Sequence, residues 1–282
     1  MISLILLILR KVKYGNYLFY FAHHVVVQHH PCHRCEEKVP STRRIKTSTM
    51  MPMDYTTQIP DQYDLYIFDL DGTLIDSLDD LTTAMNATLA HNGFPPVDRE
   101  TVRRGIGNGA RTLVSRTLAT AANVSETELV SLVERTLPEY RAEYAKHCTE
   151  KTALYPGMRE WLETLKRQGK RLAVLTNKPE DLAIRILKAL DADSFFTCIY
   201  GPESAGTLKP DPAGITLIME KTGSTPDRTI LIGDSSVDIN TARNAGIACC
   251  GITGGIGDDE ELREMGADYL VERETPLSVS IE

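Results

Sequence analysis

Two aspartates, Asp69 and Asp71, stand one residue apart at the end of an apolar run, Leu65 to Phe68. The run is short and rich in aliphatic and aromatic residues, which predicts a strand buried on both faces. Successive strand residues point to opposite faces, so side chains two apart start out on the same side. Two like charges held that close resist ionisation. The pair therefore predicts a metal site or acid–base chemistry; a capped turn, where Asp and Gly are common, is the alternative.

Thr73 follows the same run, and the segment "TLKPDP" supplies Lys209. Polar residues also follow two later apolar runs: Thr176, Asn177, Asp234 and Asp238. In parallel sheets, ligands bind outside the carboxyl ends of the strands. Carboxylates alone would suit a hard cation such as Mg²⁺ or Ca²⁺. A lysine with Thr and Asn donors adds an anion site, and phosphoryl transfer needs both. Taken singly, Asp234 is also typical of a helix N-cap and Lys209 of a solvated surface.

Strands and helices alternate regularly after residue 151, which predicts an α/β fold with a doubly wound parallel sheet. One strand lies near residue 65 and the others follow residue 171, so a helical cap domain is inserted between them. The predicted domains are a poorly ordered N-terminal extension (1–60), an α/β catalytic core (61–77 and 151–282) and a helical cap (78–150).

The predicted cap has several helix signals and no strand candidate. Ser125 with Glu128 forms a capping box, and Pro138 should end or kink the helix that follows. The segment "GIGNGA" (105–110) offers backbone N–H groups at a helix start, where a substrate carboxylate could bind. Asn108 and Arg111 are the candidate contacts. A flexible glycine-rich turn is the alternative.

The amino-acid composition and charge of the chain exclude some classes of function. The 282 residues are 42% hydrophobic and 25% charged, as in a globular protein. Residues 1–50 carry eight Lys and Arg against two Glu, which gives this segment a charge of +6. Because the whole chain has a net charge of −8, the remaining residues carry −14. An acidic body argues against nucleic acid as a partner. Six irregularly spaced cysteines suggest a reducing, cytoplasmic location. We expect a monomer or homodimer without membrane contact.

The first fifty residues differ from the remainder. The apolar run Ile2 to Leu9 is too short to span a bilayer. Cys32 and Cys35, with neighbouring histidines, have side chains that suit zinc, although no second Cys/His pair follows. The alternative is a poorly ordered extension. It has no strand or helix periodicity beyond that run, and it has little apolar surface whose burial could offset the entropy lost on ordering.

Four segments in order, "DLDGTLIDS", "LTNK", "LKPDP" and "GDSSVD", resemble the motifs of the haloacid dehalogenase superfamily. "GIGNGA", "LYPGM" and "GITGG" are similar to its phosphoglycolate phosphatase branch. The resemblance implies a Mg²⁺-dependent phosphatase that converts a small phosphorylated metabolite, 2-phosphoglycolate, to glycolate and phosphate. Its implied cofactor, Mg²⁺, would be held by Asp69, Asp234 and the backbone carbonyl of Asp71.

The same resemblance implies roles for the other residues. Asp69 would attack phosphorus and form an aspartyl phosphate, with Asp71 as general acid and then base. Phosphate would be bound by the catalytic lysine and polar donors: Lys209, Thr73, Thr176 and Asn177. Ser235 and Asp238 would orient the metal ligands.

Related proteins with other functions differ from this chain at particular residues. Dehalogenases resemble the family but lack the second aspartate, Asp71. Phosphonate-cleaving relatives use a cap lysine, and this chain has none between Ser77 and Ala145. A response-regulator receiver clusters aspartates with a lysine but lacks such a cap. Another small-molecule phosphatase or a sugar-phosphate mutase of the superfamily stays open.

Overall fold

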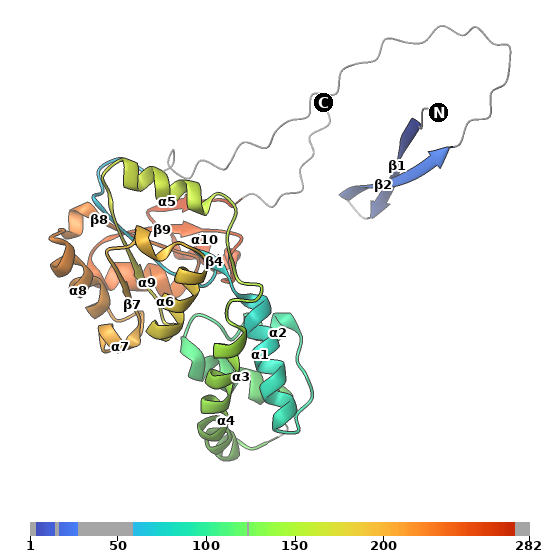
Figure 1. Ribbon diagram of the computed structural model, residues 1–282, viewed down its shortest axis with the longest axis horizontal. Helices are drawn as coiled ribbons and strands as arrows, with labels where there is room; N and C mark the ends of the chain where they lie inside the picture. Colours follow the sequence, from blue (N-terminus) through green and yellow to red (C-terminus); the bar gives the residue numbers. More distant parts are fainter. Residues whose placement is uncertain (1–3, 15–16, 28–58, 123, 274–282) are drawn as a thin grey trace, which may run out of the picture. The chain divides into compact units, whose positions relative to one another are not determined.

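A six-stranded, all-parallel sheet with the order β10-β9-β8-β3-β6-β7 forms the centre of the α/β core (Figure 1). Its strands are β3 (Leu65–Phe68), β6 (Arg171–Leu175), β7 (Cys198–Tyr200), β8 (Thr229–Gly233), β9 (Ala248–Ile252) and β10 (Tyr269–Val271). The computed structural model describes residues 4–14, 17–27, 59–122 and 124–273. The predicted α/β fold with a parallel sheet is confirmed.

Alternate residues of β3 enter two separate cores, one on each face of the sheet. Tyr66 and Phe68 pack in the core that α5 (Met158–Arg167) and α6 (Glu180–Ala189) cover. Leu65 and Ile67 face α8 (Ala213–Thr222), α9 (Ser236–Ala245) and α10 (Asp259–Met265). Shorter elements complete the connections: α7 (Pro202–Ala205), η2 (Asp193–Phe195) and η3 (Pro226–Arg228). A strand covered on both faces explains why its sequence is apolar without alternation.

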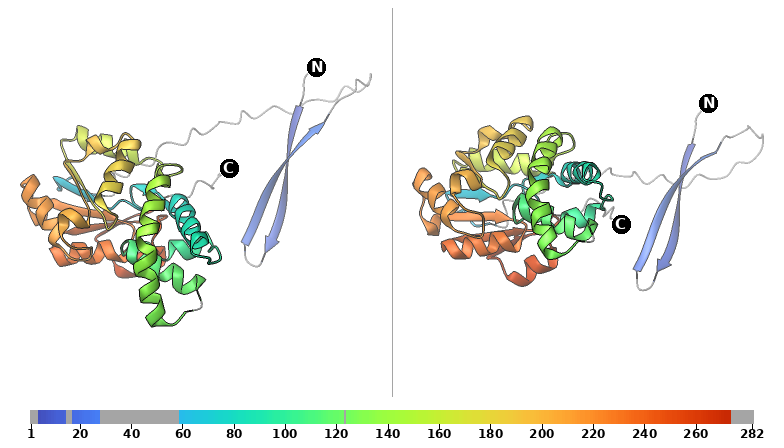
Figure 2. Two further views of the ribbon diagram at one scale, coloured as in Figure 1. Left: turned by 60° about the horizontal axis from the view of Figure 1, so that its bottom comes forward. Right: turned by 90° about the horizontal axis from the view of Figure 1, so that it is seen from below.

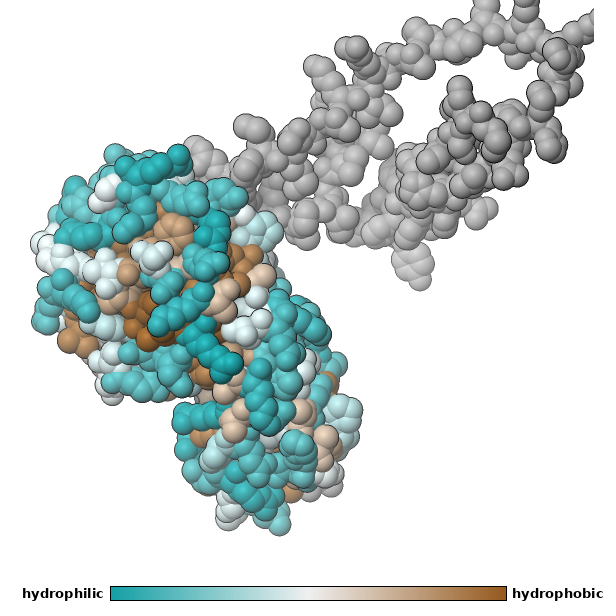
Figure 3. Space-filling view, in the orientation of Figure 1, coloured by the Kyte–Doolittle hydropathy of each residue, from teal (hydrophilic) through white to brown (hydrophobic). Residues whose placement is uncertain are grey.

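The helical insert, defined as α1 to α4, lies between β4 (Ile75–Asp76) and β5 (Ala153–Leu154). Its helices are α1 (Leu78–His91), α2 (Arg99–Arg103), α3 (Gly109–Ala121) and α4 (Glu126–His147). The two short strands pair antiparallel, which the sequence did not predict, and bring the two connections to the core together. α4 packs on α1 and α3 (Figure 2). On the face in Figure 3, the insert is mostly hydrophilic, while hydrophobic side chains show mainly over the core.

Helix α4 is one continuous element of 22 residues. It begins with the predicted capping box, in which Ser125 and Glu128 satisfy each other's backbone N–H groups. Pro138 stands inside it, so the expectation that the helix could end there was wrong. The buried side chains of Leu137 and Tyr140 on either side of Pro138 stabilise the helix through packing, which outweighs the lost backbone hydrogen bond.

The chain divides into two compact units, Met1–Thr49 and Met50–Glu282, and the sheet and the insert belong to the second. In the first, β1 (Leu4–Tyr14) pairs antiparallel with β2 (Tyr17–Val27). The expectation that no strand periodicity exists beyond the first apolar run was wrong, because β-branched and aromatic residues in "YLFYFAHHVVV" favour a strand. Cys32 and Cys35 lie outside the described residues, and the poor order of the extension stays a prediction. Among the described helices, none combines the length and apolar character that a membrane crossing requires.

Candidate active site

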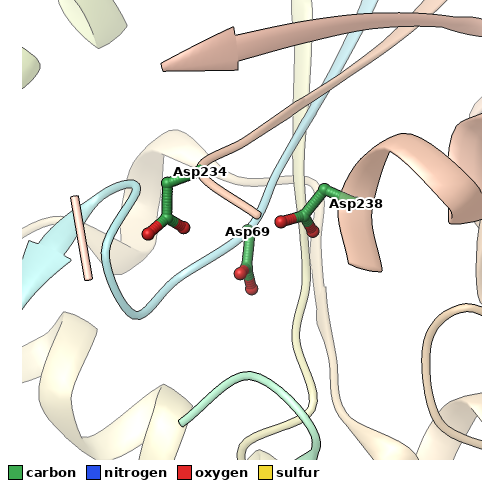
Figure 4. Close-up of side chains that lie close together, drawn as sticks. All are labelled: Asp69, Asp234 and Asp238. Atoms are coloured by element: carbon green, nitrogen blue, oxygen red, sulfur yellow. The ribbon is translucent and has the colours of Figure 1, made fainter. Parts of the chain in front are cut away.

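Three aspartates meet at the carboxyl ends of neighbouring strands. Asp69 follows β3, Asp234 follows β8, and Asp238 lies in the first turn of α9 (Figure 4). One carboxylate oxygen from each lies within 4.8 Å of the others, and all three residues are buried. The backbone N–H of Asp69 donates to the Ile232 carbonyl at 2.9 Å. The pairing of β3 with β8 therefore places residues 165 positions apart in sequence in one cluster.

Asp234 is held at both carboxylate oxygens. Its Oδ1 accepts a hydrogen bond from the Thr73 hydroxyl at 2.9 Å. Its Oδ2 accepts from the backbone N–H groups of Ile256 and Gly257 at 2.9 and 2.8 Å. Burial, followed by the nearby Asp238 charge, raises the pKa of Asp234 to about 6, against the effect of these hydrogen bonds. Gly72 has a φ of +87° and a Cβ there would collide with the Asp234 carboxylate, so the position requires glycine.

Lys209 is the cation of the cluster. Its Nζ lies 2.8 Å from Asp69 Oδ1 and donates to Asp238 Oδ1 at 2.6 Å. The other oxygen of Asp238 accepts from the Ser235 hydroxyl at 2.6 Å. Burial alone would lower the pKa of Lys209, but the Asp238 and Asp69 charges outweigh it and raise the pKa. Ser235 and Asp238 thus fix the position of the ammonium group.

The pKa of Asp69 is raised further than that of Asp234. Burial raises the pKa of Asp69 to about 8; Lys209 opposes the shift, while Asp238 and Asp234 add to it. Three buried carboxylates face one buried ammonium, so the fully ionised cluster has an excess of negative charge. An all-oxygen donor set with that excess fits a hard divalent cation such as Mg²⁺. The residues therefore fit the metal that the sequence predicted.

Asp71 lies in a different environment from Asp69. Its carboxylate accepts from Lys178 Nζ at 2.7 and 2.9 Å and from the Ser77 hydroxyl at 2.5 Å. Asp69 and Asp71 nevertheless both line the two cavities at this end of the sheet. β3 ends at Phe68, and the N–H groups of Leu74 and Ile75 both donate to the Leu70 carbonyl, so the chain turns directly after this strand. The side chain of Asp71 is not in the carboxylate cluster.

Lys178 is a site residue that the sequence reasoning missed. It is buried, its ammonium group bonds Asp71, and its Nζ lies 4.7 Å from the centre of the Tyr144 ring in α4. A signal was available, because Lys178 directly follows the two polar residues predicted after β6. The residue joins the strand-end chemistry to the helical insert.

Thr176 and Asn177, which follow β6, lie at the predicted strand end. The Asn177 side-chain amide donates to the carbonyls of Gly107 and Lys209 at 2.9 and 3.0 Å, and its oxygen accepts from the Lys209 N–H at 2.7 Å. The Thr176 hydroxyl accepts from the Lys178 N–H at 3.1 Å. The Asn177 side chain thus links the insert to the loop that carries Lys209, and both of its amide hydrogens are engaged.

The two insert residues predicted to contact substrate differ in position. Asn108 is the N-cap residue of α3 and lines a cavity of about 450 Å³ that Asp69 and Asp234 also line. Arg111 instead forms an ion pair with Glu134 of α4, with both side chains more than half exposed. Arg111 lines neither of the two cavities described here, so this arrangement does not favour its predicted contact with substrate.

A second, smaller cavity of about 60 Å³ lies between the strand ends and the insert, and we call it the insert cavity. It reaches from Asp69 and Asp71 to helix α4. The other lining residues are Leu81, Ile106, Gly107, Gly109, Ala110, Leu113, Tyr140, Arg141, Tyr144, Thr176, Asn177, Lys178, Pro179 and Leu182. Apolar side chains predominate on the insert side, which is typical of a pocket for a small ligand.

Comparison with known proteins gives concordant similarities. Residues 66–252 match the haloacid dehalogenase-like hydrolase family. A phosphoglycolate phosphatase of Pseudomonas putida is 40% identical over 191 residues, which cover 68% of this chain and 70% of that protein. A phosphoglycolate phosphatase of Haemophilus influenzae is 36% identical over 214 residues, 74% of this chain and 94% of that one. The crystal structure of a predicted phosphoglycolate phosphatase from Haemophilus somnus matches with a TM-score of 0.69 and 33% identity, covering 74% and 94% of the two chains.

Proposed function

The chain belongs to the haloacid dehalogenase-like hydrolase family, and from this premise we propose that it is a phosphatase that hydrolyses 2-phosphoglycolate to glycolate and phosphate. One observation carries the proposal: two buried carboxylates, Asp69 and Asp234, follow neighbouring strands, and Lys209 from the loop before α8 places its Nζ 2.8 Å from Asp69. This combination supplies a nucleophile, a cation for the phosphoryl oxygens and oxygen ligands for a metal. The choice of 2-phosphoglycolate as the substrate rests on similar proteins that are named phosphoglycolate phosphatases.

In the proposed reaction, Asp69 attacks the phosphorus atom and forms an acyl phosphate while the ester P–O bond breaks. Asp71 donates a proton to the departing alkoxide and later takes one from the water that hydrolyses the acyl phosphate. Lys178 and Ser77 hold the Asp71 carboxyl at the edge of the insert cavity, where the leaving group would lie. One aspartate bonds to phosphorus while the other moves the proton.

We propose Mg²⁺ as the cofactor, held by the Asp69 and Asp234 carboxylates and the Asp71 backbone carbonyl. When bound, it neutralises charge on the phosphoryl group and keeps Asp69 ionised. The Thr73 hydroxyl and the Ile256 and Gly257 N–H groups orient Asp234 for this role. Lys209 would remain on the phosphoryl oxygens, with Ser235 and Asp238 holding its position.

We further propose that the helical insert acts as a cap that excludes water from the reaction. Two contacts between the insert and the core support this role. The Asn177 amide donates to Gly107, and Arg103 in α2 donates to the carbonyls of Ile256 and Gly257 at 2.8 and 3.1 Å. The same loop, at Ile256 and Gly257, binds Asp234, so the position of the insert and that of a metal ligand are connected.

A cytoplasmic location, as a monomer or homodimer, is part of the proposal. The four described cysteines, Cys148, Cys198, Cys249 and Cys250, are buried free thiols. Burial raises the pKa of Cys249 and Cys250, which keeps both as unreactive thiols. Free thiols are typical of proteins in a reducing compartment.

The test is phosphate release from a panel of small phosphomonoesters, measured with Mg²⁺ and with excess chelator. We expect 2-phosphoglycolate to give the highest kcat/KM and the chelator to abolish release. Preference for a sugar phosphate would contradict the proposed substrate. Undiminished release in chelator would contradict the metal-dependent mechanism.

A further inference from the structure

Tyr140, in the part of α4 that lines the insert cavity, has a buried hydroxyl without a hydrogen-bond partner among the described residues. The residue is only 2% exposed. Its ring stacks on that of Tyr144, with centroids 6.1 Å apart and an interplanar angle of 6°. Nearly all buried hydroxyls in proteins are hydrogen-bonded, because an unpaired one loses its bonds to water without replacement. A bound ligand would supply the missing partner.

Arg141, the next residue, is exposed, lines the same cavity and has no ion pair or hydrogen bond within the described ranges. Three other arginines of the insert are paired with glutamates. Arg103 and Arg104 pair with Glu100, and Arg111 pairs with Glu134. Lys178, which also lines the cavity, is committed to Asp71. Arg141 is therefore the cation at this cavity that is free to bind an anion.

The size of the insert cavity restricts what can bind there. About 60 Å³ holds about four to six water-sized groups, at roughly 10–15 Å³ each. The lining runs from Asp69, where phosphorus would be attacked, to Tyr140 and Arg141. A methylene and a carboxylate beyond the ester oxygen fit that space, and the carboxylate would accept from both the hydroxyl and the guanidinium.

We infer that Tyr140 and Arg141 form the subsite for the substrate's carboxylate and select a two-carbon acid over uncharged esters. The inference rests on the proposed function, whose substrate carries this group. It replaces the predicted contact from Arg111, whose guanidinium is paired on the surface. Charge-assisted hydrogen bonds from a guanidinium are among the stronger polar interactions, and they would favour the acid over its neutral analogue.

The test uses the full chain and two substrates of the same shape, 2-phosphoglycolate and its neutral amide, phosphoglycolamide. Selectivity is the ratio of their kcat/KM values. We expect Tyr140→Phe and Arg141→Gln each to lower this ratio by about tenfold or more, and to weaken competitive inhibition by glycolate. Arg135→Gln is the matched control, because Arg135 is, like Arg141, an exposed arginine of the same helix but lines neither cavity, and its ratio should not change.

Further measurements distinguish a loss of selectivity from a loss of folding or of the proposed activity. Tyr140→Phe should keep the wild-type Tm, because the hydroxyl it removes makes no hydrogen bond within the described protein. An unchanged ratio in both variants would overturn the inference. A loss of selectivity in Arg116→Gln alone would also overturn it, since Arg116 lines only the larger cavity. If the wild type releases phosphate from neither substrate, the proposed function itself fails.

Discussion

The sheet end and the insert end of the site differ in how their polar groups are partnered. At the sheet end, Asp234 and Asp238 are bonded at both oxygens, and Lys209 bridges two carboxylates. At the insert end, the Tyr140 hydroxyl and the Arg141 guanidinium have no such bonds among the described residues. Preorganised charges stabilise a transition state without reorganising during the reaction. Unpartnered groups instead form their hydrogen bonds only when a substrate binds, so these bonds contribute to substrate affinity and selectivity.

This difference predicts two classes of variant. Changes at the sheet end should lower turnover of every phosphate ester, whereas changes at the insert end should alter which ester is preferred. A sheet-end variant that altered selectivity alone would break the comparison.

The largest effect is expected for Asp69→Asn. The amide cannot act as the nucleophile, so phosphate release should fall below detection for all substrates. Asp64→Asn is the matched control, because Asp64 directly precedes β3 but pairs with Arg228 at the surface. Phosphate assays on both variants check this, and substantial activity in Asp69→Asn would rule out covalent catalysis by that residue.

The next largest effect is expected for Asp71→Asn, which tests proton transfer to the leaving group. Asp71→Asn keeps the shape of the side chain but removes the proposed general acid and base, so kcat should fall by about 10²-fold or more. The loss should shrink for esters whose leaving groups need no proton, such as aryl phosphates. A comparison of kcat for alkyl and aryl esters measures it, and equal losses for both would argue against proton transfer by Asp71.

Acidification should weaken metal binding. The metal-free pKa values of Asp69 and Asp234 are raised to about 8 and about 6, so protons compete with Mg²⁺ as the pH falls through that range. The affinity falls with falling pH because carboxylates bind a metal only when they are deprotonated. We expect apparent Mg²⁺ affinity to fall by up to about tenfold per pH unit while one carboxylate titrates. Calorimetric titration across this range checks it, and a constant affinity would contradict the buried cluster.

A smaller effect is expected for Thr73→Val. Thr73 is fully buried and its hydroxyl donates to Asp234, so the variant loses orientation of a ligand but no charge. Mg²⁺ affinity should weaken by about tenfold. Thr82→Val, which removes a hydroxyl bonded only to the Leu78 carbonyl in α1, should bind Mg²⁺ as the wild type does. Equal affinities in the two variants would assign no positioning role to Thr73.

The smallest effect is expected from removing the N-terminal residues. All the chemistry described here lies in the unit Met50–Glu282. A protein that starts at Met51 should fold, bind Mg²⁺ and release phosphate with kinetics close to those of the full chain. Bound zinc in the full chain, lost together with activity on truncation, would support the alternative of a site at Cys32 and Cys35.

Much of the sheet end could be predicted because topology alone brings it together. Polar residues after parallel strands converge at one edge, so Asp69, Lys209 and Asp234 were identifiable without coordinates. The pairing of Asp71 with Lys178 was not, because it joins residues 107 positions apart through side chains that only the tertiary structure brings together.

The insert end was harder to predict, since its chemistry depends on which groups lack partners. Tyr140 reads in sequence as one more residue of the buried helix face. Arg111 was a reasonable candidate by position, but the packing of α3 on α4 pairs it with Glu134. Only the tertiary arrangement distinguishes a paired arginine from an unpaired one such as Arg141.

The most direct test of the central claim is the identity of the residue that carries phosphate during turnover. We would quench the Mg²⁺-loaded enzyme within one turnover of 2-phosphoglycolate and map the modified peptide by mass spectrometry. The account predicts a hydroxylamine-sensitive phosphate on Asp69 that forms and decays at rates compatible with kcat and is absent from Asp69→Asn. Steady phosphate release with no modification of Asp69, or with phosphate on another residue, would contradict it.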